Sequence, residues 1–433
     1  MKHNVLVYPN ITFRRNLAAD SYVVAVRSMI EHLLATRDDL AFTMLLPEAL
    51  GMFDIDGVEQ IDYDLPSYPN TMRAHFDTRA FIDAIDWKHR SFDIVWSHLP
   101  EHTLAIRNVF MNVTNERPVF VGYAHWFEVP ENTAYLATMF MHNLAGVLSM
   151  RECGVNSAWL RDLIIGYADE HLSHDLADAV RGVLTVQYLG TDPIPMGLIP
   201  PPVDPKLIVF NHRANEYTGF NTAVAAFDDL WTRRQDFRVM FTVAAHPDRP
   251  WAFNADTTSR YDYLMHLGTA CVGVGAFKRY SAWSVSVMDG MSVGVPYTLP
   301  RGLCYPEMVG AEHALLHDGW RDMLEHVEWM MDNPVARGTE SARALQIAES
   351  FVWDKRIDPY SEMFDRAIAA LPVLKEATDA YERVAELARD GATKADIMRV
   401  MGWGVRVPFT QYRTRLRNDG IDILAQPEQL TLA

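Results

Sequence analysis

Short apolar runs alternate with longer segments of helical period along most of the chain. In the first half, such runs predict strands near residues 4–8, 40–46, 93–97, 118–123 and 145–149. Val26, Ile30 and Leu33 share one face of a predicted helix over residues 20–34. A second series of strands is predicted at 207–210, 237–243, 271–274 and 296–299. This alternation is typical of βαβ units and parallel sheets.

A proline-dense stretch separates the two series of strands. Prolines stand at positions 193, 195, 200, 201, 202 and 205. Proline disfavours helix and stiffens the chain, so we interpret this stretch as a linker between two Rossmann-like lobes, residues 1–200 and 206–350. Ligands of such open sheets bind at the carboxyl ends of the strands, and we therefore expect a ligand site in the cleft between the lobes.

The C-terminal segment 376–433 has a different pattern from the two lobes. After residues 351–375, which we interpret as a crossover helix, a new helix is predicted beyond Pro372 and ends near Gly391. Thr393 and Asp396 resemble a capping box that opens a second, short helix. A third helix starts near residue 410, which gives the outline of a helix-turn-helix.

Charge is distributed unevenly along the chain. The 433 residues carry 39 Lys+Arg against 56 Asp+Glu, a formal net charge of −17. This balance argues against a generic nucleic-acid coat, because phosphate binding depends on clustered cations. Residues 389–419 nevertheless carry seven Lys or Arg and three Asp. Arg413 and Arg417 share one face of the third helix and are candidates for DNA binding. The alternative for these arginines is a solvated helix face, and the alternative for the tail is a dimerisation element or a brace between the lobes.

Cysteine usage and hydropathy narrow the class of protein. Cys153, Cys271 and Cys304 stand far apart, which excludes a disulfide scaffold and a zinc ribbon and favours a reducing cytoplasm. No apolar run approaches the roughly 18 residues that a membrane span needs, and residues 4–8 are interpreted as a first strand rather than as part of a signal peptide. The 16 histidines show no HExxH or HxH spacing, so no catalytic metal is expected.

The segment 273–296 carries the strongest chemical signal. Its pattern predicts a strand, a loop, a helix and a Gly-Val-Pro turn. The helix begins near Trp283 and Ser284, where free N–H groups and the positive end of the helix dipole suit an anion. Asp289 lies further along this helix, where a carboxylate can accept hydrogen bonds from ribose hydroxyls.

This segment resembles the nucleotide-binding half of retaining GT-B glycosyltransferases of the group 1 type. The family pattern is a Glu, seven residues, Glu-Ala-Met and a Gly-Val-Pro-like turn. Asp289-Gly290-Met291 and residues 294–296 match its second half, whereas Ser281 replaces the first Glu, which contacts the donor sugar in the family. Three further resemblances follow the family order, at 156–162 with 199–205, at 209–220 and at 349–354. Together they cover most of residues 1–370.

The resemblance implies which cations hold the donor. Arg213 takes the position of an Arg that binds the donor diphosphate in the family. A guanidinium at the end of a strand suits this role, because it forms charge-assisted hydrogen bonds to phosphate oxygens. Thr218 stands where the family has a Lys, and Lys278 or Arg279 can replace that charge.

The first lobe supplies the remaining candidates. His125, at the end of a predicted strand, takes the place of a His that contacts the donor sugar in the family, and His98 has a similar position. Hydrogen-bonded core histidines are the alternative for both. Arg14 and Arg15 replace the family's glycine-rich loop and suit a polyanionic acceptor. Cations and N–H groups assist the departing diphosphate in this family, usually without a metal.

The sequence therefore predicts an α/β protein of the GT-B class, with two facing Rossmann-like domains and a helix-turn-helix-like tail. The implied activity is hexosyl or pentosyl transfer from a nucleotide sugar, most readily a UDP-sugar, with no permanently bound cofactor. The tail suggests a nucleic-acid acceptor, and the combination resembles bacteriophage enzymes that glycosylate modified bases in DNA, in the host cytoplasm. The alternatives are a cell-envelope glycan or small molecule as acceptor, and a non-catalytic DNA-binding protein with a decayed glycosyltransferase body.

Overall fold

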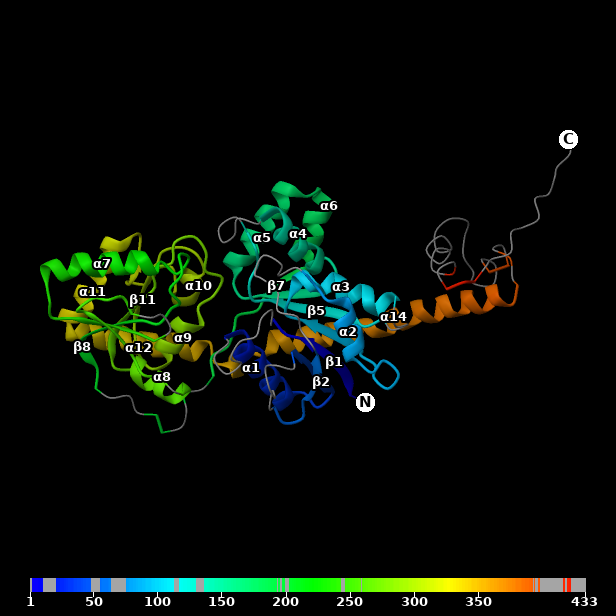
Figure 1. Cartoon of the computed structure of the whole chain (residues 1–433), viewed down its shortest axis with the longest axis horizontal. Coiled ribbons are helices and arrows are strands. Elements are labelled where there is room, and N and C mark those ends of the chain that lie inside the picture. The colour runs from blue at the N-terminus through cyan, green and yellow to red at the C-terminus, as the bar shows by residue number, and fades with distance from the viewer. Residues whose placement is uncertain are drawn as a thin grey trace.

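The computed structural model divides into two α/β lobes that lie side by side, with a long C-terminal helix running past the first of them (Figure 1). It describes residues 2–10, 21–47, 55–63, 75–112, 117–129, 136–192, 194, 197–198, 202–242, 246–257, 259–391, 393, 396–397, 416 and 419–421. None of the helices in these ranges is long and apolar enough to cross a bilayer.

The first lobe, here the N-lobe, is built on a parallel sheet with the described strand order β3-β2-β1-β4-β5-β6-β7. Its strands are β1 (His3–Tyr8), β2 (Leu40–Pro47), β3 (Glu59–Tyr63), β4 (Ile94–Ser97), β5 (Val119–Ala124), β6 (Glu152–Val155) and β7 (Leu184–Val186). Its helices are α1 (Ser21–Thr36), α2 (Thr78–Ala84), α3 (Pro100–Asn112), α4 (Leu136–Val147), α5 (Ala158–His171) and α6 (His174–Val183). The strand order reverses between β1 and β4, where Tyr8 is in register with Ser97, and this point is the binding crevice of such sheets.

The second lobe, here the C-lobe, repeats the arrangement with the described order β10-β9-β8-β11-β12-β13. The strands are β8 (Asp204–Phe210), β9 (Arg238–Phe241), β10 (Ala252–Asn254), β11 (Ala270–Val274), β12 (Tyr297–Pro300) and β13 (Leu316–His317). The helices are α7 (Phe220–Arg233), α8 (Arg260–Leu267), α9 (Val285–Ser292), α10 (Tyr305–Val309), α11 (Trp320–Asp332) and α12 (Pro334–Ser350). The corresponding switch point lies between β8 and β11, which pair directly.

The strands predicted from apolar runs are confirmed with one exception. Residues 145–149 do not form a strand, because they belong to the end of α4 and the turn after it, and the next strand is β6. Leu144 and Val147 face the core at helical spacing. Gly146 permits close packing, since a Cβ there would lie 1.7 Å from the Pro100 carbonyl oxygen at the start of α3. The run is apolar because one side of a helix is buried.

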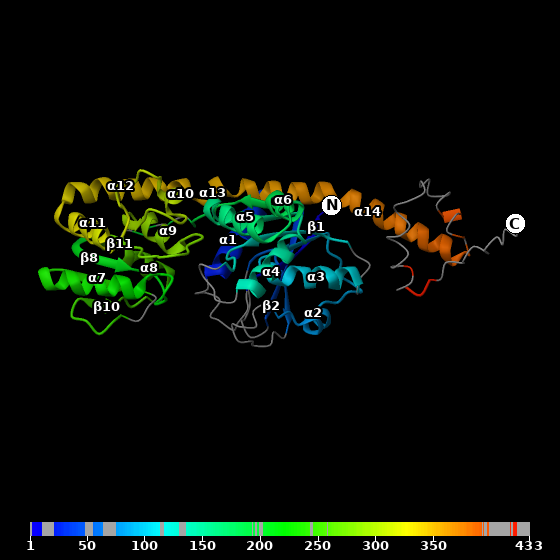
Figure 2. The same ribbon diagram turned by 90° about the horizontal axis from the view of Figure 1, so that it is seen from above.

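The chain returns from the C-lobe to the N-lobe at Phe351–Trp353. Phe351 is buried in the C-lobe core, whereas Trp353, the first residue of α13 (Trp353–Arg356), is buried in the N-lobe core. The Thr191 N–H donates to the Phe351 carbonyl at 2.7 Å, which joins the outgoing and returning segments. Figure 2 shows α12, α13 and α14 (Asp358–Arg389) following one another along both lobes.

Helix α14 is continuous, which corrects the prediction of a break at Pro372. The first half of the helix packs Tyr360, Met363 and Phe364 into the N-lobe core. The backbone stays helical through residue 372 and ends before Gly391, whose φ is +79°. Proline removes one helical N–H but has a φ angle that the helix accepts, and the preceding Ala-Ala-Leu sequence favours helix.

A small hydrophobic cluster lies at the far end of α14, away from the lobes (Figure 2). Tyr381, Val384, Ile397 and Leu416 are buried in it. The predicted capping box is confirmed, because the Thr393 hydroxyl and backbone N–H both donate to Asp396, whose own N–H donates to the hydroxyl at 3.3 Å. Arg413 and Arg417 lie outside the described residues.

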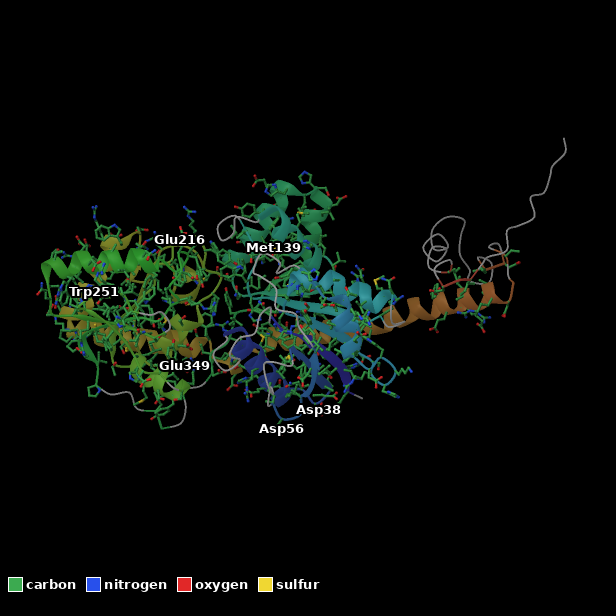
Figure 3. The ribbon with its side chains drawn as sticks, in the orientation of Figure 1. Asp38, Asp56, Met139, Glu216, Trp251 and Glu349 are labelled. Atoms are coloured by element: carbon green, nitrogen blue, oxygen red, sulfur yellow. The ribbon has the colours of Figure 1, made fainter. Side chains whose placement is uncertain are left out.

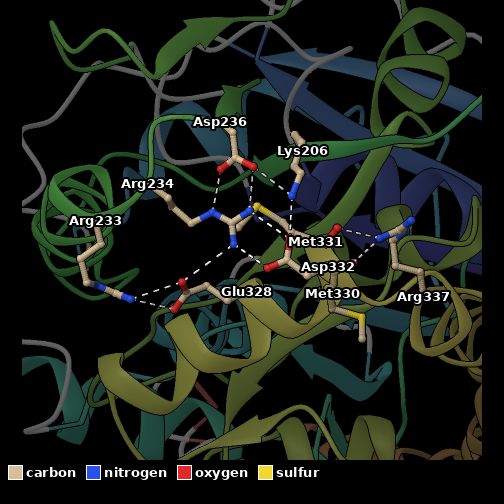
Figure 4. Close-up of polar contacts among 9 residues, drawn as sticks. All are labelled: Lys206, Arg233, Arg234, Asp236, Glu328, Met330, Met331, Asp332 and Arg337. Carbon is tan, nitrogen blue, oxygen red and sulfur yellow. Dashed lines mark hydrogen bonds and ion pairs between the residues drawn. The ribbon is translucent and has the colours of Figure 1, made fainter.

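The edge of the C-lobe sheet where its strands begin is closed by an ion-pair network (Figure 4). Arg234 donates to Asp236 at 2.7 Å and to Asp332 at 2.7 Å, and Lys206 reaches Asp332 at 2.6 Å. Hydrogen bonds from Arg234 and Lys206 lower the pKa of Asp332 to about 2. The network ties the start of β8 to the end of α11.

The packing around the crossover leaves no space for a side chain at Gly190. A Cβ there would lie 2.2 Å from the indole of Trp353, which is 2% exposed and has no room to move. Gly190→Ala should lower the free energy of unfolding by about 1–3 kcal/mol, measured by urea denaturation. Gly182→Ala is the control, because its Cβ meets nothing within 4 Å in α6, and it should be neutral or stabilising by about 0.5–1 kcal/mol. Equal effects of the two substitutions would contradict the packing argument.

Candidate functional site

Three exposed cations gather at the C-lobe switch point. Arg213 follows β8, and Lys278 and Arg279 follow β11. Within the described part of the chain, none of their side chains has an ion pair or hydrogen bond. Glu216, in the loop that carries Arg213, lies on the side of the C-lobe that faces the N-lobe (Figure 3). Unneutralised cations at this position suit a polyanionic ligand.

The loop that carries Arg213 is braced from within. Thr218 is 2% exposed, and its hydroxyl lies 2.7 Å from the Arg213 carbonyl and 2.8 Å from the Asn215 carbonyl. Gly219 has a φ of +69°, and a Cβ there would lie 1.8 Å from the Ala276 carbonyl. Thr218 therefore holds the loop in shape through hydrogen bonds to its backbone.

The predicted anion-binding helix begins as the sequence indicates. Ser284 caps α9, and its hydroxyl accepts from the Val287 N–H at 3.4 Å. Trp283, partly buried, stacks against Tyr188 and Phe351 with ring centroids 5.3 and 5.1 Å apart. The first turn of α9 therefore lies beside the segments that connect the lobes.

Residues 280–285, which we call the junction segment, lie across the edge of the N-lobe sheet. Tyr280 and Ala282 are buried in the hydrophobic cluster on one face of that sheet, and Trp283 and Val285 pack against the cluster on the other face. The Phe127 N–H, after β5, donates to the Tyr280 hydroxyl at 3.3 Å. This contact brings the segment after β5, which begins with His125, against the segment after β11, which contains Lys278 and Arg279.

Ser281, within the junction segment, faces back into the C-lobe. It is 3% exposed, and its hydroxyl donates to the Tyr305 hydroxyl at 3.0 Å. The Cys304 thiol lies 3.6 Å from the same oxygen. The position that carries a Glu in the resembling family is here occupied by a buried, hydrogen-bonded serine.

The N-lobe contributes a pair of buried histidines. His98 follows β4 and His125 follows β5, and their Nδ1 and Nε2 atoms lie 2.9 Å apart. Burial lowers the pKa of His125 to about 3 and, with the neighbouring imidazole, that of His98 well below its ordinary value. The pair is neutral near pH 7, so one ring donates to the other. The two candidate histidines are therefore direct neighbours.

Asp289 is engaged by an arginine that the sequence pattern did not reveal. Arg260, at the start of α8, donates to both carboxylate oxygens, at 2.8 and 2.5 Å. Asp289 is 6% exposed. It therefore faces α8 as half of an ion pair, and its predicted contact with ribose hydroxyls stays a prediction. The partners are 29 positions apart in the sequence, and no periodic signal links them.

Glu307 forms a contact between the lobes that the sequence interpretation missed. Its carboxylate, on α10, accepts from the Ala158 and Trp159 N–H groups at 2.7 and 2.5 Å, across the lobes. The Tyr188 hydroxyl donates to it at 3.1 Å. A carboxylate at the first turn of α5 complements free N–H groups and the helix dipole. This contact holds the lobes together beside the junction segment.

Four predicted residues fall outside the described residues, namely Arg14 and Arg15 of the N-lobe and Arg413 and Arg417 of the tail. Their proposed contacts with an acceptor stay predictions. Among the described residues, no group of three His, Cys, Asp or Glu side chains is placed to hold a metal.

Solved structures share this two-lobed architecture over most of the chain. Sucrose-phosphate synthase from Thermosynechococcus elongatus is 14% identical, with a TM-score of 0.64 over 86% of this chain and 100% of its own. The catalytic domain of starch synthase IV from Arabidopsis thaliana, bound to ADP and acarbose, is 8% identical, with a TM-score of 0.65 over 85% and 99%. HepE from Anabaena, in complex with UDP-glucose, is 10% identical, with a TM-score of 0.58 over 84% and 99%.

These structures define the class of fold to which the chain belongs, namely GT-B, with two parallel-sheet α/β domains facing one another. No protein-family model and no curated protein sequence matches the chain. At identities of 14% or less the likeness establishes the fold and leaves the substrate to be argued from the site.

The buried histidines predict acid sensitivity. The folded pKa values of His125 (about 3), His212 and His313 (both about 4) lie below the ordinary value because burial disfavours the charged form. The unfolded chain therefore takes up protons first, so this stability is fully present above about pH 6.5 and is lost as the pH falls towards the folded values. Each such group should contribute on the order of 1 kcal/mol per pH unit in that window.

Urea denaturation between pH 7.5 and 4.5 tests this prediction. His125→Gln should give a shallower fall of the free energy of unfolding with decreasing pH than the unmodified chain. His142→Gln, at an exposed position on α4, is the control and should follow the unmodified chain. Superimposable pH profiles for His125→Gln and the unmodified chain would refute the role of the buried pair.

Proposed function

We propose that the chain is a glycosyltransferase that moves a sugar from a nucleoside-diphosphate sugar to an acceptor hydroxyl. The observation that carries the proposal is the set of three cations, Arg213, Lys278 and Arg279, at the switch point of the C-lobe. They flank the start of α9, whose free N–H groups suit the same diphosphate. In this proposal, the carboxyl ends of the N-lobe strands, with His125 directly after β5, form the other side of the site.

The donor that we propose is a uridine diphosphate sugar. HepE binds UDP-glucose and starch synthase IV binds ADP in their solved structures, each on the same fold. The chemical requirement is stabilisation of negative charge on the departing diphosphate, which Arg213 and its neighbours supply through charge-assisted hydrogen bonds. The family resemblance implies that His125 lies near the sugar, and attack from the face that the diphosphate leaves gives retention.

For the acceptor, we propose a hydroxyl on a modified base in DNA. The basic excess of residues 389–419 supports this choice. So does the buried cluster of Tyr381, Val384, Ile397 and Leu416, because a tail with its own core can present cations away from the lobes. A base inside a duplex is out of reach of the interlobe junction, so transfer requires base flipping.

An uncharged glycan or small molecule is the second candidate acceptor, and one observation favours it. The residues after β4 and β5 at the N-lobe edge, 98–103 and 125–129, include no Lys or Arg, whereas Arg14 and Arg15 follow β1 in the sequence. The segments after β4 and β5 offer neutral and acidic groups instead, such as His102, whose Nδ1 lies 2.9 Å from the Tyr8 hydroxyl, and Glu101, which accepts from Asn143 at 2.9 Å. Such groups match sugar hydroxyls better than phosphates.

Arg213→Ala should reduce turnover by about 100-fold, because one stabilising donor to the diphosphate is lost. The assay measures UDP release from a panel of UDP-sugars with modified DNA or glycans as acceptor. Arg238→Ala is the control, since Arg238 pairs with Asp204 at the opposite edge of the sheet, and it should retain normal turnover. Normal activity of Arg213→Ala would refute its phosphate role, and absence of any nucleotide-sugar turnover or binding would support the decayed-body alternative.

Deletion of residues after 376 should weaken binding to duplex DNA and leave the thermal shift induced by UDP unchanged. Residues Tyr360–Leu371, which anchor α14 in the N-lobe, are retained in this variant. Binding is measured at several salt concentrations, and the salt dependence of the DNA affinity should decrease as phosphate contacts are lost. DNA affinity equal to that of the full chain would discard the DNA role of the tail and favour the uncharged acceptor.

A further inference from the structure

An ion pair between Arg260 and Asp289 lies beside the candidate donor site. Asp289 lies on α9, which begins at the junction segment, and its side chain is 8% exposed. Arg260 reaches it from α8 and donates one N–H to each oxygen, while 48% of its own side chain remains exposed. The pair thus joins a buried carboxylate to a guanidinium that solvent and ligand can reach.

The surroundings of the pair are polar, uncharged and held in place. Asn211, directly after β8, donates to the Tyr263 hydroxyl at 3.0 Å and to the Ser286 carbonyl at 2.7 Å, and accepts from the Tyr297 hydroxyl at 3.0 Å. Burial and the charge of Asp289 raise the pKa of Tyr263, which therefore keeps its proton. These contacts connect the end of β8 to α8 and α9, so the Asp289 carboxylate has little freedom to turn.

A carboxylate this deeply buried needs a partner that compensates its charge and satisfies its hydrogen-bonding capacity. Arg260 supplies that partner and occupies one acceptor position on each oxygen. A carboxylate has about four such positions, so Asp289 keeps acceptor capacity beyond the positions that Arg260 and the neighbouring Tyr263 hydroxyl use. Two acceptors on one rigid carboxylate match the vicinal 2′ and 3′ hydroxyls of a ribose.

We propose that Arg260 is a positioning residue of the donor site, which holds the Asp289 carboxylate in the orientation that accepts hydrogen bonds from the ribose hydroxyls. The pair thereby selects ribonucleoside diphosphates over 2′-deoxyribonucleoside diphosphates. This inference rests on the proposed function. Arg260 acts through Asp289, whereas Arg213, Lys278 and Arg279 act on the diphosphate, and the two groups should therefore have separable effects.

Isothermal titration of UDP and 2′-deoxy-UDP measures this selection directly, with ADP and 2′-deoxy-ADP as a second pair. The unmodified chain should bind the ribonucleotide about tenfold more tightly, as expected for a hydrogen bond to a charged group. Arg260→Gln and Asp289→Asn should each reduce the ratio to about threefold or less, chiefly by weakening the ribonucleotide. The double variant should show no larger loss than either single variant, since the residues act as a unit.

Two further variants distinguish a positioning role of Arg260 from the loss of any surface arginine and from the loss of charge alone. Arg249→Gln is the matched control, because Arg249 forms an exposed pair with Asp228 elsewhere on the C-lobe, and it should keep the tenfold ratio. Arg260→Lys retains the charge and should restore part of the ratio, which keeps the test decisive if Arg260→Gln folds poorly. If instead Arg260 only neutralises phosphate, Arg260→Gln would weaken both nucleotides equally.

The outcomes distinguish this inference from the proposed function. An unchanged ribonucleotide to deoxyribonucleotide ratio in Arg260→Gln, with UDP or ADP still bound by the unmodified chain, overturns the role of Arg260 alone. The same holds if both nucleotides are weakened equally in the Arg260 variants. Failure of the unmodified chain to bind any of the four nucleotides overturns the inference together with the nucleotide-sugar function.

Discussion

The junction segment is the contact on which the rest of the structure depends. It packs against both faces of the N-lobe sheet. Tyr280 and Ala282 contact one face, and Trp283 and Val285 contact the other. A segment that belongs to the C-lobe by connectivity is therefore packed as part of the N-lobe. Because α9 follows directly, the position of its N-terminus relative to His125 is set by this packing rather than by the proline-rich linker.

Two further contacts make the junction resistant to rotation of the lobes. Glu307 on α10 accepts from the first N–H groups of α5, and the crossing at Phe351–Trp353 buries neighbouring aromatic residues in different lobes. Tyr188 contacts both Glu307 and Trp283, so the polar and the aromatic contacts are coupled through one side chain. Relative movement of the lobes must break these contacts together.

Electrostatics differ sharply between the two edges of the C-lobe sheet. At the edge where strands begin, Arg234, Lys206, Asp236 and Asp332 neutralise one another. At the opposite edge, the described contacts leave Arg213 and its neighbours without carboxylate partners. Folding alone gives no reason for the second arrangement, since unneutralised cations at one place repel each other. A ligand with two or more negative charges removes that cost.

The sequence predicted most of the fold, because period-2 and period-3.6 patterns record which face of an element is buried. It failed where packing overrides the pattern, as at residues 145–149, where a helix buries an apolar run, and at Pro372, where α14 tolerates a lost N–H. The candidates His98, His125 and Ser284 could be proposed from the sequence because each directly follows a strand or caps a helix, and Arg213 stands three positions after β8. Arg260 and Glu307 could not, since their partners lie far away in the sequence and meet them only after folding.

The sequence departs from the pattern of the family that it resembles at two positions in the C-lobe. Ser281 and Thr218 replace charged residues, and both are buried and hydrogen bonded within the C-lobe. Burying a charge at either position without a partner would be costly, so small hydroxyl residues preserve the shape of the loops. The cations remain nearby on Arg213, Lys278 and Arg279. This redistribution, with the loop geometry kept intact, supports a donor site with an altered set of contacts rather than a body that has lost its function.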